Sequence, residues 1–564
     1  MSVEIRRRAL AAAPDLAPGL HPVLKRVYAA RGIERADDLD LSLERLLPVS
    51  TLAGVEPAAE LLAAHASAGR VLVIGDFDAD GATGTALLVR ALRALKFAHV
   101  DFLVPNRFKF GYGLTPGIVA QAAERRPTLI VTVDNGVSSL EGVEAARAIG
   151  IPVLITDHHL PAQRLPAAEV IVNPNLPGSR FGSRALAGVG VAFYVIVALA
   201  RKLGAQDFKP AELLDLVAVG TVADLVPLDR NNRVLVAQGL RRIRAGRCAA
   251  GLRALIECAG RRLDQLTAAD LGFVVAPRLN AAGRLTDMSV GIACLLADDA
   301  HSAAALAAQL SRLNEQRREI EQRMQLEAVE LAAAVRFDEA GGETLGLCLF
   351  DERWHQGVVG LVAGRIKDRL HRPVIAFARA GDGSLRGSAR SVTGIHVRDV
   401  IDAIASRRPG LIEKFGGHAM AAGMTLPESK LEEFRSAFAQ EIAARADVES
   451  LRGVVFTDGE LEPAELCLST ARVLREAGPW GQGFPEPLFD GAFRVRETRI
   501  VGTQHLKLTL EGGLDAIAFR YVGGAMEDDA LRAGAPVELA YRLEVNEFNG
   551  AERVQLNCQH LRLR

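Results

Sequence analysis

The chain has 564 residues, and its length predicts two to four domains, because a single hydrophobic core rarely grows beyond about 250–300 residues. Hydrophobic residues make up 49% and charged residues 24%, a globular composition that excludes a fibrous or wholly disordered chain. The formal net charge of -1 excludes binding to nucleic acid or anionic membranes through overall basicity, although it is compatible with a local basic surface.

The cysteines and the apolar stretches indicate the compartment. The six cysteines are scattered without a Cys-x-x-Cys pair, so the sequence predicts neither a disulfide framework nor a thiolate zinc site. The N-terminal residues lack an apolar stretch long enough for a signal peptide. The longest uncharged apolar stretch, Ala185–Ala200, is shorter than the roughly 18–20 residues that span a bilayer. We therefore expect a cytoplasmic protein that does not associate with a membrane.

The first half of the chain has the pattern of an α/β protein. Residues 1–48 show helical periodicity and predict an N-terminal extension. In residues 49–230, short β-branched runs alternate with amphipathic segments, which is the signature of parallel βαβ units. Residues 231–340 predict a helical connector that ends in one long helix at 301–335, a segment without Gly or Pro. The strands expected in the α/β region are Val71–Ile74, Leu129–Val133, Val153–Thr156 and Val170–Val172.

The second half predicts two further domains. Residues 341–450 predict another α/β domain, with strands at Leu345–Phe350 and Pro373–Ala378 and helices at Val358–Leu370 and Leu431–Ala444. Residues 451–564 change character, because short strands there are separated by Gly, Asp and Asn turns. Five short strands predict a small β-barrel. They are expected at Phe493–Val501, Leu506–Leu510, Ala516–Phe519, Val537–Val545 and Val554–Leu561.

A cluster of carboxylates follows the first strand of the α/β region. The strand at 71–74 leads into three carboxylates at alternate positions, Asp76, Asp78 and Asp80. Alternation would place them on one side of an extended segment, and carboxylates this close repel one another unless a divalent cation lies among them. A calcium-binding loop is the alternative, but Leu87 stands where its final Glu would be, and a strand rather than a helix precedes the loop.

Three further apolar stretches, which we expect to be strands, end in acidic residues: Asp134, Asp157 and Asp224. His158 and His159 directly follow Asp157. A single Asp after a strand is usually a helix cap, but four acidic strand ends would meet at one edge of a parallel sheet, so we expect a shared metal site. Oxygen and imidazole ligands suit Mn²⁺ or Mg²⁺, with zinc as an open alternative, and the number of ligands predicts two ions.

The four acidic segments resemble the motifs of the DHH phosphoesterase superfamily, which is named after an Asp-His-His like that at 157–159. Further motifs resemble those of the bacterial single-strand-specific exonucleases in this superfamily: Pro105-Asn-Arg-Phe, Gly111-Tyr-Gly, Pro277-Arg-Leu-Asn-Ala-Ala-Gly-Arg284, Trp354-His-Gln-Gly-Val-Val-Gly360 and Gly416-Gly-His-Ala-Met-Ala-Ala-Gly423. The resemblance implies an α/β protein with a DHH domain, a long connecting helix, a DHHA1 domain and a C-terminal OB-fold β-barrel. It also implies two-metal-ion hydrolysis of single-stranded DNA in the 5′→3′ direction to 5′-mononucleotides, in DNA repair and recombination.

Position by position, the resemblance also implies roles for single residues. Asp134 would be the bridging ligand, His159 would contact the scissile phosphate, and Asp157 would orient the two histidines. The metal ligands would be Asp76, Asp78, Asp80, Asp134, His158 and Asp224. The catalytic residues would be Asp78, Asp80, Asp134, His158 and His159.

Charge is distributed unevenly along the chain. Residues 365–414 contain about 11 Lys and Arg against about 5 acidic residues, whereas residues 454–564 contain about 12 against about 17. A solvated surface is the alternative for the basic segment, but its small residues would let phosphate approach the backbone N–H groups. We expect phosphate contacts from Arg278, Arg284, Ser388, Arg390 and His418, with Asn280 fixing Arg278. We expect charge and base stacking from Arg107, Lys109 and Tyr112, with core packing as the alternative for the aromatic ring.

Two other functions stay open at this point. A DHH phosphodiesterase of cyclic dinucleotides or short oligonucleotides would share the metal site, and a non-catalytic replication scaffold could share the fold. The barrel, the long helix and the Arg278–Arg284 motif favour a longer polymer as substrate. The resemblance further implies a single-strand-binding protein and a helicase as partners, and we expect a monomer.

Overall fold

The computed structural model describes residues 3–9, 16, 19–106, 109–334, 345–381, 383–447, 451–502, 505–519, 521, 531–548 and 550–564. By its internal contacts the chain divides into two compact units. The larger unit comprises residues 5–312 and 456–564, and the smaller unit comprises residues 1–4 and 313–455. The boundary near Arg312 falls inside one continuous helix, α13 (Ala300–Ala334), which matches the long helix expected at 301–335.

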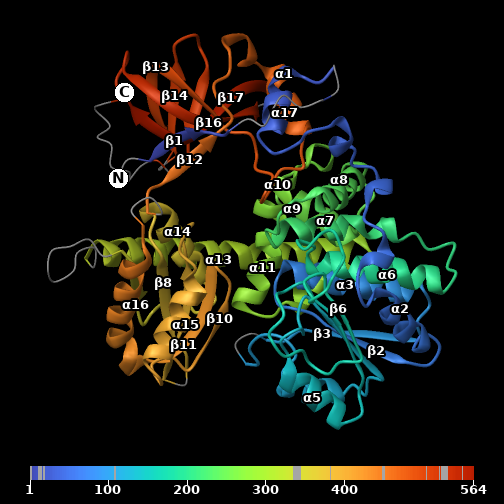
Figure 1. Ribbon diagram of the computed structural model, residues 1–564. Helices are drawn as coiled ribbons and strands as arrows, with labels where there is room; N and C mark the ends of the chain where they lie inside the picture. Colours follow the sequence, from blue (N-terminus) through green and yellow to red (C-terminus); the bar gives the residue numbers. More distant parts are fainter. Residues whose placement is uncertain are drawn as a thin grey trace. The chain divides into compact units, whose positions relative to one another are not determined.

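The larger unit contains a five-stranded parallel sheet in the order β3-β2-β4-β5-β6. Figure 1 draws this sheet in blue to green and labels β2, β3 and β6. The four predicted strands are present, and the fifth, β3, was not predicted. Its sequence, His99–Leu103, alternates polar and apolar side chains at the edge of the sheet, so it lacks the apolar run of the buried strands. The strands are β2 (Arg70–Ile74), β3 (His99–Leu103), β4 (Leu129–Val133), β5 (Val153–Thr156) and β6 (Val170–Val172).

Helices cover both faces of this sheet. Leu72, Ile74 and Ile130 point to one face, where they form a core with side chains of α4 (Pro116–Ala123) and α5 (Leu140–Ala148). Because side chains alternate along a strand, their neighbours point to the opposite face, where α3 (Ala79–Ala94) and α6 (Gly188–Lys202) contact the strands. Both α3 and α6 begin near the carboxyl edge of the sheet.

The expectation of a strand that ends at Asp224 is wrong, because this segment is helix α7 (Leu214–Ala223) and Asp224 is its C-cap. Eight consecutive residues of α7 are buried, and the helix contacts α3, α6 and α8 (Arg230–Arg244). A helix buried on every side has a continuous apolar run without helical periodicity, which resembles a buried strand in sequence. Further helices of this part of the chain are α2 (Val55–Ala64), α9 (Ala250–Cys258), α10 (Ala268–Asp270), η6 (Leu271–Val275), α11 (Ala276–Leu285) and α12 (Ser289–Leu296), and short 3₁₀ turns occupy Val49–Thr51, Pro210–Leu213 and Leu263–Gln265.

The expectation of a helical N-terminal extension is correct only for α1 (Pro22–Ala29). Among the described residues of this segment, Glu4–Arg7 form strand β1, which pairs with β12 (Val454–Thr457), and 3₁₀ turns occupy Ala36–Leu39 and Leu43–Arg45. Arg31 connects the segment to the C-terminal region through a two-pronged ion pair with Asp458 at 2.8 and 3.0 Å. Long-range pairing thus overrides local helical periodicity here.

The C-terminal residues of the larger unit form the expected barrel. Its strand order is β13-β14-β15-β17-β16, and pairing of β13 with β16 closes it. One helix, α17 (Leu468–Glu476), contacts β16 and β17. The strands are β13 (Phe489–Val501), β14 (His505–Leu510), β15 (Asp515–Ala518), β16 (Pro536–Phe548) and β17 (Ala551–Leu563).

The smaller unit is a second α/β domain with sheet order β10-β11-β9-β8-β7. One face packs on α14 (Val359–Leu370) and the end of α13, and the other face packs on α15 (Val397–Arg407) and α16 (Leu431–Arg445). The strands are β7 (Leu347–Phe350), β8 (Val374–Arg379), β9 (Ser384–Arg390), β10 (Lys414–Gly417) and β11 (Ala421–Pro427).

Among the helices that the structure describes, none is by itself both long and apolar enough to cross a membrane. Two short helical segments joined by a bend, Leu43–Thr51 and Val55–Ala64, reach that length and composition only when they are taken together.

Candidate metal centre

Three neighbouring strands deliver acidic and imidazole side chains to one edge of the parallel sheet. Strand β4 lies between β2 and β5 and runs parallel to both, so their carboxyl ends lie side by side. Asp76 follows β2, Asp134 follows β4, and His158 follows β5. The fourth segment is the end of helix α7, which brings Asp224 within 3.4 Å of His158 Nε2. The structure therefore brings together the four acidic segments that the sequence predicts, one of them from a helix.

The turn after β2 separates its three carboxylates. Asp78 is the N-cap of α3 and accepts a hydrogen bond from the backbone N–H of Gly81 at 3.0 Å. Asp80 lies in the first turn of α3, so the expectation of three carboxylates along one side of an extended segment is wrong for this residue. The Asp80 carboxylate accepts hydrogen bonds from the backbone N–H groups of Gly188 at 2.7 Å and Val189 at 2.9 Å, at the start of α6. These bonds fix Asp80 against a second helix N-terminus.

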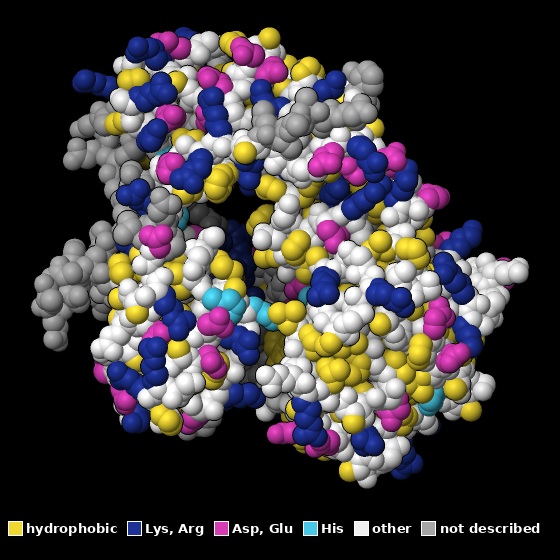
Figure 2. All heavy atoms as spheres, in the orientation of Figure 1, with side chains coloured by type: hydrophobic (Ala, Val, Ile, Leu, Met, Phe, Trp, Pro, Cys, Tyr) yellow, Lys and Arg dark blue, Asp and Glu magenta, His cyan; other side chains and the backbone are white. Residues whose placement is uncertain are grey.

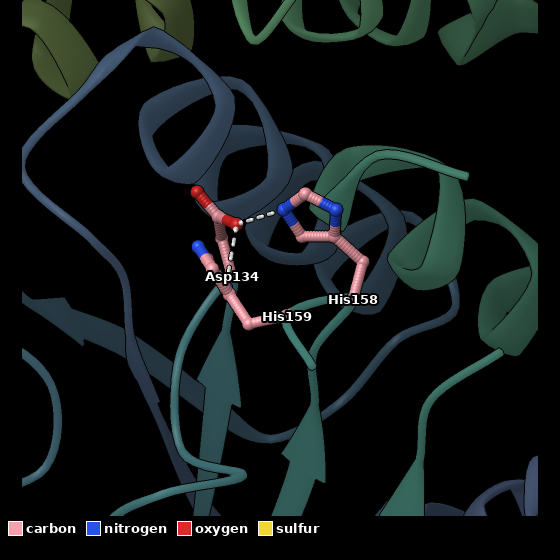
Figure 3. A group of neighbouring side chains, drawn as sticks. All are labelled: Asp134, His158 and His159. Carbon is pink, nitrogen blue, oxygen red and sulfur yellow. Dashed lines mark ion pairs between the residues drawn. The ribbon is translucent and has the colours of Figure 1, made fainter. Parts of the chain in front are cut away.

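Asp134 lies at the centre of the cluster. Its Oδ1 is 3.0 Å from His158 Nε2 and 3.9 Å from His159 Nδ1, and both imidazoles point toward this carboxylate (Figure 3). The backbone of Asp134 has a φ of 62°, a conformation that is uncommon for a residue other than Gly. Its neighbour Asn135 holds the turn, because its side-chain amide donates to the backbone oxygens of Ile74 and Val133. Asp134 Oδ1 is buried and, apart from its contact with His158, has no hydrogen-bond partner among the described residues.

Asp157 orients the histidine segment. Its Oδ1 accepts hydrogen bonds from the backbone N–H groups of His158 at 2.7 Å and His159 at 3.1 Å, and lies 2.8 Å from His159 Nδ1. Its Oδ2 accepts from the backbone N–H of Val137 at 2.8 Å. A carboxylate saturated in this way holds the His-His turn and the adjacent turn after β4 together.

Two sets of side chains in the cluster could each hold a cation. The Asp76 group consists of Asp76, Asp78 and Asp134, and the His158 group consists of Asp80, His158 and Asp224. Within each group the potential ligand atoms lie within 4.8 Å of one another. Asp134 and His158 also form a third such set with His159, so Asp134 connects the groups. The buried Asp134 oxygen and the mixed oxygen and imidazole donors fit divalent ions such as Mn²⁺ or Mg²⁺.

The crowding of carboxylates perturbs their protonation. Burial, followed by the charge of Asp78, raises the pKa of Asp80 to about 7. Burial and the charge of Asp80 also raise the pKa values of Asp134 and Asp224 well above the usual range for aspartate. Burial opposes the charged form of His159, but its hydrogen bond to Asp157 and the surrounding carboxylates raise its pKa to about 9. Without a cation, the close packing of these carboxyls therefore favours their protonated forms.

The predicted DNA contacts of the larger unit lie on two segments. Arg107 lies outside the described residues. Lys109 is in the exposed turn after β3, and Tyr112 contacts the metal centre through its hydroxyl group. On α11, Arg278 donates to Ser311 Oγ at 3.1 Å and to the backbone oxygen of Val274 at 2.6 Å.

Asn280, which is predicted to help fix Arg278, has a contact that the sequence did not indicate. Its Oδ1 accepts a hydrogen bond from the backbone N–H of Ala79 at 2.8 Å. It thereby supports the turn between Asp78 and Asp80. Arg284, further along α11, is partly buried.

The predicted contacts of the smaller unit form a separate cluster on its sheet. Ser388 and Arg390 lie on β9, where an Arg390 Nη1 donates to Ser388 Oγ at 3.1 Å. A Cβ atom at Gly360, near the start of α14, would lie 2.8 Å from Ser388 Oγ and 3.0 Å from Arg390 Nη2, so only Gly leaves these donors in place. His418 follows β10, and its backbone N–H donates to the oxygen of Ala421 at 2.7 Å. On the face of the barrel that Figure 2 shows, basic and acidic side chains are intermingled.

Several residues that build the metal centre were not predicted from the sequence. Asn173 and Asn175, directly after β6, donate to the backbone oxygens of His159 at 2.9 Å and His158 at 2.6 Å. A Cβ atom at Gly188 would lie 2.6 Å from Asp134 Cβ, and one at Gly220 would lie 2.8 Å from Asp80 Oδ1. The two asparagines directly follow a predicted strand, so their position at the edge of the sheet could have been predicted from the sequence. The glycines carried none, because their requirement arises from packing between helices and the sheet edge.

Comparison with known proteins connects this architecture to one family. Family models match the chain over residues 70–221 (DHH family, N-terminal domain), 342–444 (DHHA1 domain) and 457–560 (RecJ OB domain). The single-stranded-DNA-specific exonuclease RecJ of Escherichia coli (strain K12) is 52% identical over 571 residues, which cover 98% of each chain.

Solved structures agree with this match. The crystal structure of RecJ from Thermus thermophilus in complex with Mn²⁺ has a TM-score of 0.81 at 33% identity, covering 99% of this chain and 80% of that chain. The Mg²⁺ complex of RecJ from the same organism has a TM-score of 0.75 at 32% identity, covering 99% and 78%. The expected α/β fold with DHH, DHHA1 and OB domains is confirmed. The chain belongs to the RecJ family of the DHH superfamily.

Proposed function

We propose that the protein is a metal-dependent exonuclease that hydrolyses single-stranded DNA from the 5′ end and releases 5′-mononucleotides. The observation that supports this function most is the pair of adjacent candidate cation sites, in which Asp134 Oδ1 of one group lies 3.0 Å from His158 Nε2 of the other. Two adjacent cations are a common means of hydrolysing phosphodiesters in nucleases. The named activity of the Escherichia coli relative, which matches this chain almost from end to end, supports single-stranded DNA as the substrate.

We propose Mn²⁺ or Mg²⁺ as the cofactor, with two ions in the centre. The Asp76 group would hold one ion and the His158 group the other. Asp134 would be the bridging ligand, because it belongs to the Asp76 group and its Oδ1 is 3.0 Å from His158 Nε2. When bound, such ions lower the pKa of a water molecule and stabilise the charge that develops on a phosphate during in-line displacement.

The chain's own side chains would orient the substrate phosphate. Against the effect of burial, the hydrogen bond to Asp157 and the neighbouring carboxylates raise the pKa of His159 to about 9, which favours a protonated ring that can donate to a phosphate oxygen. Its position is set by the 2.8 Å contact with Asp157. His159 would therefore contact the scissile phosphate, and Asp157 would act on catalysis only through the two histidines.

Basic and small residues would guide the strand. In the larger unit, Lys109, Arg278 and Arg284 would contact phosphates, as would Ser388, Arg390 and His418 in the smaller unit. Asn280 would support the turn that carries Asp80 through its bond to Ala79, and not the DNA directly. The barrel would bind DNA through a local surface, because acidic residues outnumber basic ones there.

The test is digestion of one oligonucleotide labelled at either end, in single-stranded and duplex form, with Mn²⁺ or with EDTA. We expect labelled mononucleotide to appear first from the 5′ end of the single strand, with slow digestion of the duplex and no digestion in EDTA. Asp134→Ala is the matched loss-of-site variant, because Asp134 belongs to the Asp76 group and its Oδ1 lies 3.0 Å from His158 Nε2 of the other group.

Three outcomes would contradict the proposal. Release first from the 3′ end would refute the polarity, and equal digestion of the duplex would refute single-strand specificity. Full activity of Asp134→Ala would refute the assignment of the centre. We further propose that the protein acts in the cytoplasm as a monomer. The family resemblance implies a single-strand-binding protein and a helicase as its partners.

A further inference from the structure

One tyrosine of the larger unit touches three of the segments that carry candidate ligands. Tyr112 lies between Gly111 and Gly113, whose φ values of 77° and 75° are left-handed conformations that favour glycine. The segment is fastened directly after the tyrosine, because the backbone N–H of Leu114 donates to Ser139 Oγ at 3.2 Å. The backbone around Tyr112 is thus shaped and anchored to present this side chain.

The contacts of Tyr112 converge on the turns after β2, β4 and β5. Its hydroxyl group donates to the backbone oxygen of Asp134 at 3.1 Å. The same hydroxyl oxygen lies 3.2 Å from Nδ1 and 3.4 Å from Nε2 of His159. The tyrosine ring also meets the ring of His159 edge to face at 5.8 Å, and that of Phe77 in the same way at 6.1 Å. Phe77 separates Asp76 from Asp78 in the sequence.

We infer that Tyr112 is a positioning residue of the metal centre, in addition to any contact with DNA. The hydroxyl group contacts the backbone of Asp134 and the side chain of His159. Asp134 has the uncommon φ of 62°, and a hydrogen bond to its backbone oxygen restrains that turn. His159 is held by Asp157 on one side and faces the hydroxyl of Tyr112 as well. Side chains that hold metal ligands in position in this way influence the affinity of the site for its metal ion.

This inference rests on the proposed metal centre and gives Tyr112 a role that its sequence context did not predict. A purely stacking role would depend on the aromatic ring, whose residue is 48% exposed. A positioning role depends instead on the hydroxyl group, because the ring edges of Phe77 and His159 would still meet a phenylalanine. The two roles therefore make opposite predictions for Tyr112→Phe.

The experiment compares Tyr112→Phe and Tyr112→Leu with the unaltered protein. Tyr28→Phe is the matched control, because the Tyr28 hydroxyl also donates to a backbone oxygen, that of Ala477 at 2.8 Å, but its ring packs on Trp480 and Phe484. Mn²⁺ binding to DNA-free protein is measured by the electron paramagnetic resonance of free Mn²⁺. The melting temperature, kcat and KM on single-stranded DNA are measured in parallel.

For Tyr112→Phe we expect a loss of roughly 10–100-fold in Mn²⁺ affinity or in kcat, with KM changed less than about twofold. Tyr28→Phe should bind Mn²⁺ like the unaltered protein. Unchanged Mn²⁺ affinity and kcat in Tyr112→Phe, with a raised KM only in Tyr112→Leu, would overturn the inference in favour of stacking alone. Equal effects of Tyr112→Phe and Tyr28→Phe would also overturn it. Because Mn²⁺ binding is measured without DNA, this result stands apart from the outcome of the nuclease test.

Discussion

The substitution Gly188→Ala tests how closely the metal centre is packed. Gly188 is the first residue of α6, and its backbone N–H donates to Asp80 while its Cα faces Asp134. An added Cβ atom would lie 2.6 Å from Asp134 Cβ, 2.8 Å from its Oδ1 and 2.9 Å from its Cγ. Carbon atoms in contact are normally about 3.5–4.0 Å apart, so the Asp134 side chain must move by about 1 Å.

A displacement of the Asp134 side chain by about 1 Å should lower the rate of hydrolysis. The helix start is held by two hydrogen bonds to Asp80, so the displacement falls mainly on Asp134, whose carboxylate moves together with its Cβ atom. Misplacing a reacting group by about 1 Å costs roughly 100-fold in rate, or about 2.7 kcal/mol of transition-state stabilisation. Overpacking at such a site also lowers the free energy of unfolding by about 1–3 kcal/mol. We therefore expect kcat to fall about 100-fold while the protein stays folded.

The assay is steady-state hydrolysis of single-stranded DNA at saturating Mn²⁺, together with the melting temperature. Gly364→Ala is the matched control, because Gly364 lies in helix α14 and a Cβ atom there would meet no atom within 4 Å. The control should keep full activity and gain stability, since Ala favours a helix over Gly by about 1 kcal/mol. If Gly188→Ala keeps kcat and Mn²⁺ affinity equal to those of Gly364→Ala, the packing argument is refuted.

Two further predictions concern protons and DNA. Burial and neighbouring charges raise the pKa of Asp80 to about 7 and the pKa values of Asp134 and Asp224 well above the usual range. The metal-free folded protein therefore keeps protons that the unfolded chain releases near pH 4. Its free energy of unfolding should fall as the pH rises from about 4 to 7 and beyond. Cations bind the deprotonated carboxylates, so the affinity for Mn²⁺ should increase from about pH 6 to about pH 8. Calorimetry measures this affinity, and equal values at both pH values would contradict the prediction. Arg390→Gln should weaken binding to single-stranded DNA and reduce the slope of log K against log salt by about 0.7, whereas the exposed Arg398→Gln should act as a control; identical slopes would remove Arg390 from the phosphate contacts.

Most of the metal centre could be predicted from the sequence, because most of its candidate ligands directly follow parallel strands. Asp76, Asp134 and His158 come after short β-branched apolar runs, which are typical of buried parallel strands, and such strands end at one edge of the sheet. Their proximity could therefore be predicted without coordinates. The family and the three domain types were predicted from the resemblance of several motifs to those of a known family, and they are confirmed.

The missed strands show where sequence patterns are weak. Strands β9 and β11 consist largely of small or polar residues, such as the Gly387–Ala389 and Ala421–Gly423 segments, which have low strand propensity by themselves. They form strands because they pair with each other, and β9 also pairs with β8. Pairing of this kind depends on residues distant in the sequence.

By itself, the sequence determined which side chains could bind cations, because their types and their places after apolar runs are local properties. Only the tertiary structure decided how they divide into two groups. Asp80 leaves the extended turn for the first turn of α3, and Asp224 arrives from the end of a buried helix rather than a strand. The glycines that make room for Asp134 and Asp80, and the tyrosine that connects three turns, depend on close approach between distant segments. Such approach is fixed by packing in three dimensions, which no local pattern records.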